Sequence, residues 1–115
     1  MKVQRPQNPF PLLQDVADFP PAQRVVSAVV GTHTHVQTAD EQIFPGGTGY
    51  ITDAGMTGPI RSVIGIPVEN SISGFLGGVR RPHQPAPGPC AMRGVLYTLD
   101  SATGGCTQIE RIDMR

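Results

Sequence analysis

Two of the three histidines in this 115-residue chain are separated by a single residue, in the segment "VVGTHTHVQTAD". Imidazole nitrogens bind divalent metals such as zinc at about 2.0–2.1 Å, so His33 and His35 are candidate metal ligands. Side chains two positions apart on an extended segment leave from the same face. We therefore predict that both imidazoles reach one ion, or one each of a pair about 3.5–4 Å apart.

The pattern alone does not complete a metal site, because a structural zinc has about four ligands and a catalytic zinc about three from the protein. Asp40 and Asp53 can add carboxylates, although acidic loop residues are commonly solvated. His83 lies among prolines, where a surface position is expected. The sequence contains no phosphate-binding glycine loop and no G-x-S-x-G elbow for a serine nucleophile. An ordinary loop with a chance H-x-H therefore stays open as an alternative.

The histidines follow "RVVSAVVG" at residues 24–31, a nearly all-apolar run typical of a strand covered on both faces. Open sheets place their ligands in loops at the carboxyl ends of such strands. Next along the chain, "QIF", "PGG" and "TGYITD" predict a short hairpin, and "AGMTGP" predicts a second glycine-rich loop after it. Two loops that can carry a site therefore follow two predicted strands.

The second half of the chain predicts one helix and one hairpin. Residues 67–78, "PVENSISGFLGG", combine a starting proline, apolar residues at helical spacing and two terminating glycines. Residues 79–89 hold four prolines and predict a connector. "CAMRGVLYTLD", "SATGG" and "CTQIERIDM" predict a hairpin whose register stays open, because Ile109 and Ile112 do not alternate. In residues 1–23, "PLLQDVADF" predicts about two helical turns within a proline-rich, irregular segment.

The composition excludes several classes of function. Nine basic and nine acidic residues give a net charge of +0, which argues against binding in a DNA groove or to an anionic membrane. No apolar run approaches the roughly 20 residues of a membrane span, and we recognise no secretory signal. Cys90 and Cys106 are then expected as reduced thiols of a cytoplasmic protein, with a disulfide across the hairpin as the alternative.

The segment "VVGTHTHVQTADEQIFPGGTGYITDAGMTGPIRSVIG" resembles, almost without a gap, the C-terminal part of a bacterial family of calcineurin-like metallophosphoesterases. The resemblance continues through "ENSISGFLGG" and the predicted hairpin. It implies an α/β fold for residues 24–115, namely the β-rich C-terminal part of a four-layered α/β/β/α sandwich. It also implies a phosphodiesterase that acts on cyclic nucleotides with two divalent metal ions, iron or manganese, with zinc as the alternative.

The resemblance also implies roles for particular residues. In the family, G-T-H-T-H is the last metal motif, so His33 is expected to bind one metal ion and His35 the other. The loop "DAGMTGP" resembles a loop beside the family's site, which makes Asp53, Thr57 and Gly58 candidates for contact with the substrate. No residue of this chain is assigned as a catalytic acid, base or nucleophile.

Several family motifs have no counterpart in the sequence. These are an N-terminal aspartate ligand, a glutamate, a G-N-H motif and a further strand histidine. The resemblance therefore implies a truncated or split member of the family, which acts as a homo-oligomer or with a complementing chain on a phosphodiester substrate. An unpaired edge of the strand at 24–31 would favour such association. The alternative is a non-catalytic remnant that binds a metal or associates with itself.

Overall fold

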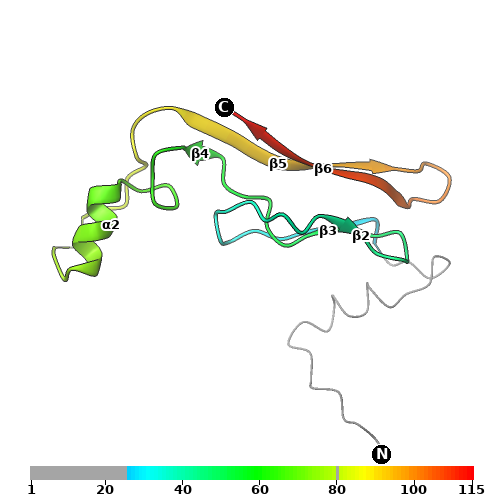
Figure 1. Cartoon of the computed structure of the whole chain (residues 1–115), viewed down its shortest axis with the longest axis horizontal. Coiled ribbons are helices and arrows are strands. Elements are labelled where there is room, and N and C mark those ends of the chain that lie inside the picture. The colour runs from blue at the N-terminus through cyan, green and yellow to red at the C-terminus, as the bar shows by residue number, and fades with distance from the viewer. Residues whose placement is uncertain (1–25, 80) are drawn as a thin grey trace, which may run out of the picture.

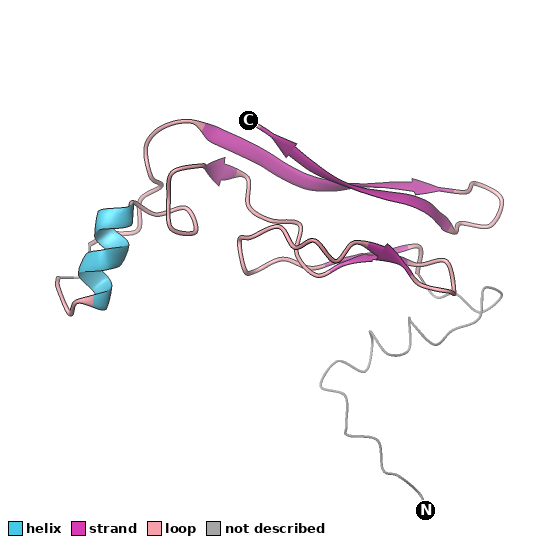
Figure 2. Cartoon of the chain, viewed as in Figure 1, coloured by secondary structure: helices cyan, strands magenta, loops and turns pink. Residues whose placement is uncertain are grey.

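The computed structural model describes residues 26–79 and 81–115, so the helical turns predicted within residues 1–23 lie outside the described residues. The described part is β-rich with one helix, which confirms the α/β class (Figures 1 and 2). In chain order its elements are β1 (Ala28–Val30), β2 (Gln42–Ile43), β3 (Gly49–Ile51), β4 (Gly58–Pro59), α2 (Val68–Phe75), β5 (Cys90–Leu99) and β6 (Cys106–Met114).

The first sheet is mixed and has the order β1-β3-β2. Strands β2 and β3 pair antiparallel, which confirms the predicted hairpin, and β1 pairs parallel with β3, with Val30 opposite Ile51. Because β1 and β3 run in the same direction, the loops that follow them leave from the same edge of the sheet. This edge carries the histidine loop and the second glycine-rich loop.

Strand β1 is shorter and more exposed than predicted. It has three residues, and Val30 at its end is 51% exposed. Within the described residues β1 pairs with β3 alone, so its other backbone edge is open. The prediction of a strand covered on both faces is therefore wrong for this chain. A valine-rich run is buried only where further layers cover it.

The second sheet has the order β4-β5-β6, and its antiparallel β5–β6 pair confirms the predicted C-terminal hairpin. Asp100 shapes the turn, because its Oδ1 accepts hydrogen bonds from the amides of Ala102 (2.9 Å) and Thr103 (2.8 Å). In the observed register Ile109 is opposite Tyr97 and Ile112 is opposite Gly94. The two isoleucines thus lie on opposite faces of the hairpin, which explains why they do not alternate in a simple pattern.

The hairpin packs on the first sheet at Gly49. A Cβ atom at this position would lie 2.6 Å from the Cys106 sulfur and 2.9 Å from the Tyr97 ring, so only glycine allows the approach. The Tyr97 hydroxyl donates to the Val29 carbonyl (3.0 Å), and the Cys106 amide donates to the Gly47 carbonyl (2.7 Å). Cys106 is buried, Cys90 is exposed and both are free thiols, as predicted.

Helix α2 lies at one end of the molecule, apart from β1–β3 (Figure 1). It begins after Pro67 and ends at Phe75, close to the predicted bounds. None of its residues is buried, and Phe75 is 90% exposed. No helix within residues 26–79 and 81–115 has the length and apolar character that crossing a membrane requires.

Candidate metal-binding loop

The loop at residues 31–40 leaves β1 and folds against the end of β3. The Gly31 amide donates to the Ile51 carbonyl (3.1 Å), and the Ala54 amide donates back to the Gly31 carbonyl (2.9 Å). The loop therefore begins at the carboxyl end of two parallel strands, the position predicted from the sequence.

The two histidines adopt backbone conformations that the sequence does not predict. The φ angle is +112° at His33 and +67° at His35, in a region that residues other than glycine rarely occupy. The segment is therefore not extended, and the expectation that both imidazoles leave from one face because of strand geometry is wrong. Between the two histidines, Thr34 is bonded through its amide and its hydroxyl to Asp53 at the end of β3, which bends the loop away from an extended path.

Thr34 is held by the buried carboxylate of Asp53, whose side chain is 1% exposed. One carboxylate oxygen of Asp53 accepts hydrogen bonds from the Thr34 amide (2.7 Å) and the Thr34 hydroxyl (2.7 Å). The other oxygen accepts a bond from the Gly55 amide (2.8 Å). The Thr34 hydroxyl, followed by the Gly55 amide, holds the pKa of Asp53 below its ordinary value, and burial opposes them less strongly. Asp53 is therefore an ionised group that determines the shape of the histidine loop.

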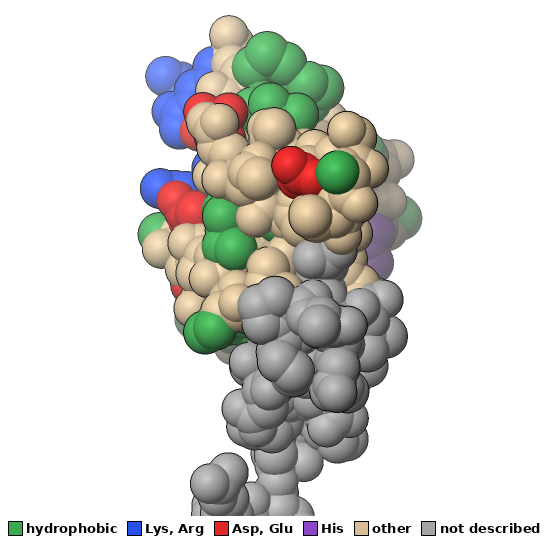
Figure 3. Space-filling model, turned by 90° about the vertical axis from the view of Figure 1, so that its right-hand side faces the viewer, with side chains coloured by type: hydrophobic (Ala, Val, Ile, Leu, Met, Phe, Trp, Pro, Cys, Tyr) green, Lys and Arg blue, Asp and Glu red, His purple; other side chains and the backbone are tan. Residues whose placement is uncertain are grey.

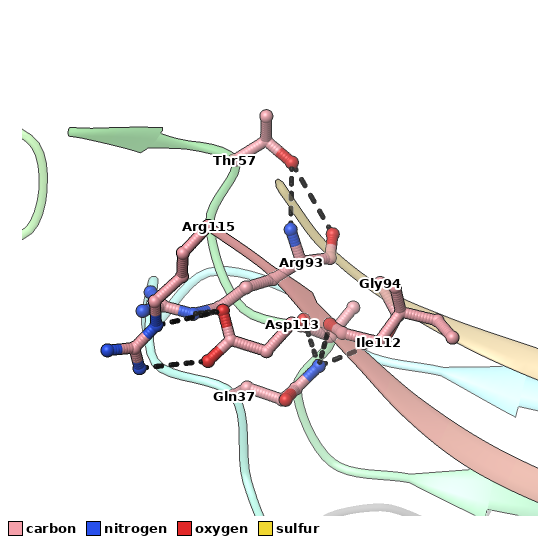
Figure 4. A network of polar contacts seen from close by, with 8 residues as sticks. Gln37, Thr57, Arg93, Gly94, Ile112, Asp113 and Arg115 are labelled. Carbon is pink, nitrogen blue, oxygen red and sulfur yellow. Dashed lines mark hydrogen bonds and ion pairs between the residues drawn. The ribbon is translucent and has the colours of Figure 1, made fainter. Parts of the chain in front are cut away.

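Gln37 attaches the same loop to the hairpin (Figure 4). Its side-chain amide donates to carbonyls of three segments, at Ala54 (3.2 Å), Gly94 (2.9 Å) and Ile112 (3.2 Å). Close by, the Thr38 amide donates to the Asp53 carbonyl (3.1 Å) and the Asp53 amide donates to the Thr38 hydroxyl (3.0 Å). The loop is thus held along its length by polar contacts from distant parts of the chain.

His35 is the histidine with a defined partner. Its Nδ1 lies 2.9 Å from the backbone carbonyl of Ile64. A carbonyl can only accept, so Nδ1 carries the hydrogen, and in the neutral ring Nε2 keeps its lone pair. His33 is exposed, and its imidazole makes no hydrogen bond to any residue in the described ranges. Metal-binding histidines commonly donate their second ring N–H to a carbonyl in the way that His35 does.

The two imidazoles fit a divalent metal in donor type, but they form only part of a ligand set. Within the described residues no group of three or more His, Cys, Asp or Glu side chains is placed to hold a metal ion. Asp40, the other candidate carboxylate, bonds instead to the amide (3.2 Å) and the hydroxyl of Thr52.

The three residues predicted to contact the substrate lie in three different environments. The Thr57 side chain is exposed, and its hydroxyl accepts from the Arg93 amide (3.3 Å) (Figure 4). Gly58 lies in β4 opposite Ala91 of β5. Their contact with a substrate stays a prediction. Asp53 is buried and both of its carboxylate oxygens accept hydrogen bonds within the chain, and its contact with a substrate stays a prediction too.

Sequence reasoning missed the residues that support the loop, above all Gln37 and Ile64. A glutamine two residues after an H-x-H motif is a weak local signal, because its three acceptors lie up to 75 positions away along the chain. The Ile64 carbonyl gives no signal at all, because every residue of a protein carries the same backbone group. These contacts depend on the tertiary fold.

Charge is balanced around the hairpin. Arg111 pairs with Glu41 (3.0 Å), and Asp113 pairs with Arg93 (3.5 Å) and Arg115 (3.0 Å). Figure 3 shows basic and acidic side chains next to one another along one edge of the face that it displays.

A cavity of about 740 Å³ beside α2 is lined by Phe75, Arg81 and His83 among others, and the histidine loop does not line it.

Residues 22–112 match the protein family described as YmdB-like protein. The chain belongs to this family. It is 48% identical over 86 residues to the 2',3'-cyclic-nucleotide 2'-phosphodiesterase of Bacillus subtilis (strain 168), covering 75% of this chain and 33% of the relative. The match confirms the phosphoesterase family indicated by the sequence.

Two solved structures agree with this chain in fold. A novel phosphatase from Mycoplasma pneumoniae superposes with a TM-score of 0.72 at 40% identity, over 77% of this chain and 32% of that chain. A hypothetical protein from Thermus thermophilus gives a TM-score of 0.72 at 35% identity, over 87% of this chain and 38% of that chain. The chain thus spans about a third of the length of the relatives it matches.

Proposed function

We propose that this chain forms part of a metal-dependent phosphoesterase, in which His33 and His35 are ligands of a two-metal centre. The observation that carries the proposal is the 2.9 Å contact between Nδ1 of His35 and the Ile64 carbonyl. This contact leaves Nε2 of His35 with a lone pair for a metal ion. The buried carboxylate of Asp53 holds the loop between the two histidines in place.

The residues of the chain contribute in three ways. Asp53 and Gln37 hold the loop before any ligand arrives, so little conformational entropy is lost on binding. The two imidazoles supply nitrogen donors suited to iron or manganese, or to zinc. With two such ions held there, the site would have an activated water for attack on phosphorus and positive charge to offset the phosphoryl oxygens. The Thr57 hydroxyl is exposed and donates to the Arg93 carbonyl (3.4 Å), so it would have to exchange this bond to donate to a phosphoryl oxygen.

We further propose a cyclic-nucleotide diester as the substrate. The name and the 48% identity of the Bacillus subtilis relative support this choice. The chain spans about a third of that relative, so the remaining metal ligands are proposed to come from a complementing chain or a second copy. The edge of β1 that does not pair with β3 is one of the sheet edges in the described structure with which another strand could pair.

Metal content and phosphodiester hydrolysis test the proposal. The purified chain is assayed with added manganese or iron, alone and mixed with the part of the Bacillus subtilis relative that lies outside the matched 86 residues. We expect bound metal, and turnover of a cyclic-nucleotide diester in at least one arrangement. His33→Ala and His35→Ala should each lower metal affinity more than about tenfold.

His83→Ala is the matched control, because it removes the third imidazole from the proline-rich connector. It should leave metal affinity and turnover unchanged. Equal losses in all three variants, or metal binding that survives the removal of both loop histidines, would contradict the proposed site.

A second candidate function is a non-catalytic module that binds a metal or associates with itself. The absence of a third metal-binding side chain near His33 and His35 in the described part favours it. It predicts a defined oligomer in which metal is bound without turnover, with the complementing part present or absent. Hydrolysis that depends on His33 and His35 would rule it out.

A further inference from the structure

The turn at residues 62–66 has an unusual backbone next to the histidine loop. Ile64 has a φ of +47° and Gly65 a φ of +102°. A positive φ at a β-branched residue is a rare, strained conformation. The Ile64 side chain is 53% exposed, so burial of that side chain does not explain why the strain is kept.

The turn is closed by its own hydrogen bonds. The Ser62 hydroxyl donates to the Pro59 carbonyl (2.8 Å) and accepts from the Gly65 amide (3.0 Å). Val63 and Ile66 exchange two backbone bonds across the turn, of 2.9 and 3.1 Å. These bonds leave the Ile64 carbonyl directed out of the turn, where it meets Nδ1 of His35.

We infer that Ile64 is a positioning residue, and that the strained turn at residues 62–66 uses its backbone carbonyl to select the Nδ1–H tautomer of His35. The consequence is that His35 presents Nε2 as its ligating nitrogen. The positioning of the ring is a property of the metal-free chain. Its use for metal binding rests on the proposed function above.

The strained turn has a definite effect on the imidazole in this arrangement. Isolated neutral imidazole can place its proton on either ring nitrogen, so a loop histidine without a partner presents a mixture of donors. A carbonyl 2.9 Å from Nδ1 removes this choice, because a lone pair on Nδ1 would face a lone pair on oxygen. A partner fixed by the closed turn also limits rotation of the ring.

The tautomer of His35 is measured directly by 15N NMR of the histidine-labelled, metal-free chain at about pH 9, where imidazoles are neutral. The spectrum of His35→Gln assigns the signal. We expect His35 in the Nδ1–H form, and His33, which is exposed and without a hydrogen-bonded partner among the described residues, as a mixture of both forms. His35 in the Nε2–H form would overturn the inference.

Gly65→Ala tests the role of the turn. An added Cβ would lie 3.1 Å from the flexible Met56 side chain, at a φ of +102° that side-chain-bearing residues rarely adopt. We expect this backbone strain to be relieved by a shift of the turn that carries the Ile64 carbonyl with it. Gly77→Ala is the matched control, because it places the same methyl group at a φ of +74° with nothing within 4 Å, at the end of α2. Both variants are checked for native fold by the dispersion of their amide NMR signals.

We expect Gly65→Ala to convert His35 to a mixture of tautomers and to weaken zinc binding about tenfold, while Gly77→Ala changes neither. A folded Gly65→Ala chain with an unchanged tautomer would overturn the inference. Ile64→Gly keeps the carbonyl and relieves the backbone strain, so it should preserve the Nδ1–H tautomer of His35, and it can be measured even if Gly65→Ala fails to fold. Loss of the Nδ1–H form in Ile64→Gly would also contradict the inference. Because the tautomer is read without metal, failure of zinc to bind both the chain alone and its mixture with the complementing part would count against the proposed function and not against this inference.

Discussion

The histidine loop and helix α2 differ in what holds them. The loop at residues 31–40 has little burial of its own, yet Asp53, Gln37 and Thr38 fasten it to three other segments. Helix α2 has good local helix signals and an apolar stripe, yet none of its residues is buried. The loop owes its shape to tertiary contacts, whereas the helix owes its form to local sequence. Substitutions that remove a contact of the loop should therefore cost much more stability than substitutions on the exposed helix.

The largest effect is expected for Asp53→Asn. The amide can accept on one side only, so its NH2 group must face either the donors of Thr34 or the amide of Gly55. The loop should lose its shape, with a fall in metal affinity of about 10- to 100-fold and a larger loss of stability than any variant below. Metal titration and urea unfolding measure the two losses. Native affinity in Asp53→Asn would show that Thr34 does not need the carboxylate.

The pH dependence of stability should report the same carboxylate. The pKa of Asp53 lies below its ordinary value of 3.8 in the folded chain, mainly because of the Thr34 hydroxyl. The ionised form therefore stabilises the fold fully above the unfolded pKa, and this contribution is lost as the pH falls through the folded pKa. Urea unfolding between about pH 6 and pH 2 should show a weaker dependence in Asp53→Asn than in the native chain. Parallel curves would assign the acid sensitivity to other carboxylates.

Gln37→Met should rank next. Methionine keeps the length and the apolar body of the side chain but removes the donors to Ala54, Gly94 and Ile112. Carbonyls that lose a partner in a partly buried place cost about 1–3 kcal/mol in the free energy of unfolding. Gln108→Met on the exposed surface of β6 is the control and should change little. Similar values for both variants would mean that water replaces the amide of Gln37.

Tyr97→Phe should have a smaller effect. It removes the hydroxyl that donates to the Val29 carbonyl at 3.0 Å and joins the hairpin to β1. The expected loss is about 1 kcal/mol in the free energy of unfolding. Tyr50→Phe removes a hydroxyl with an exposed partner and should cost less. The reverse order would indicate that the contact between the hairpin and β1 is weak in solution.

The smallest effect is expected in α2. Phe75→Ser replaces a side chain that is 90% exposed, so the free energy of unfolding should change by no more than about 0.5 kcal/mol. Sedimentation and urea unfolding of the variant check this result. A large loss, together with a change in solution mass, would show that another chain covers the helix and that the two regions are less different than the described structure indicates.

Much of the secondary structure was predictable because its signals are local. Pro67 and the glycines after residue 76 bracket α2, and the "SATGG" turn marks the β5–β6 hairpin. The burial of β1 was not predictable, because a valine run does not say whether other layers are present to cover it. The position of His33 and His35 at the carboxyl end of a strand followed from the order of the elements. The shape of their loop did not.

The candidate metal-binding side chains, the strand before them and the family to which they belong can all be read from the amino-acid sequence. Neighbouring residues encode these features through residue type, spacing and turn chemistry. The contacts of Asp53 with Thr34, of Gln37 with the hairpin and of the Ile64 carbonyl with His35 arise only in the folded chain. These contacts join residues 19, 57 and 29 positions apart in the chain. Two of them end on backbone carbonyls, and because every residue has the same carbonyl group, the amino-acid sequence does not indicate which one is used.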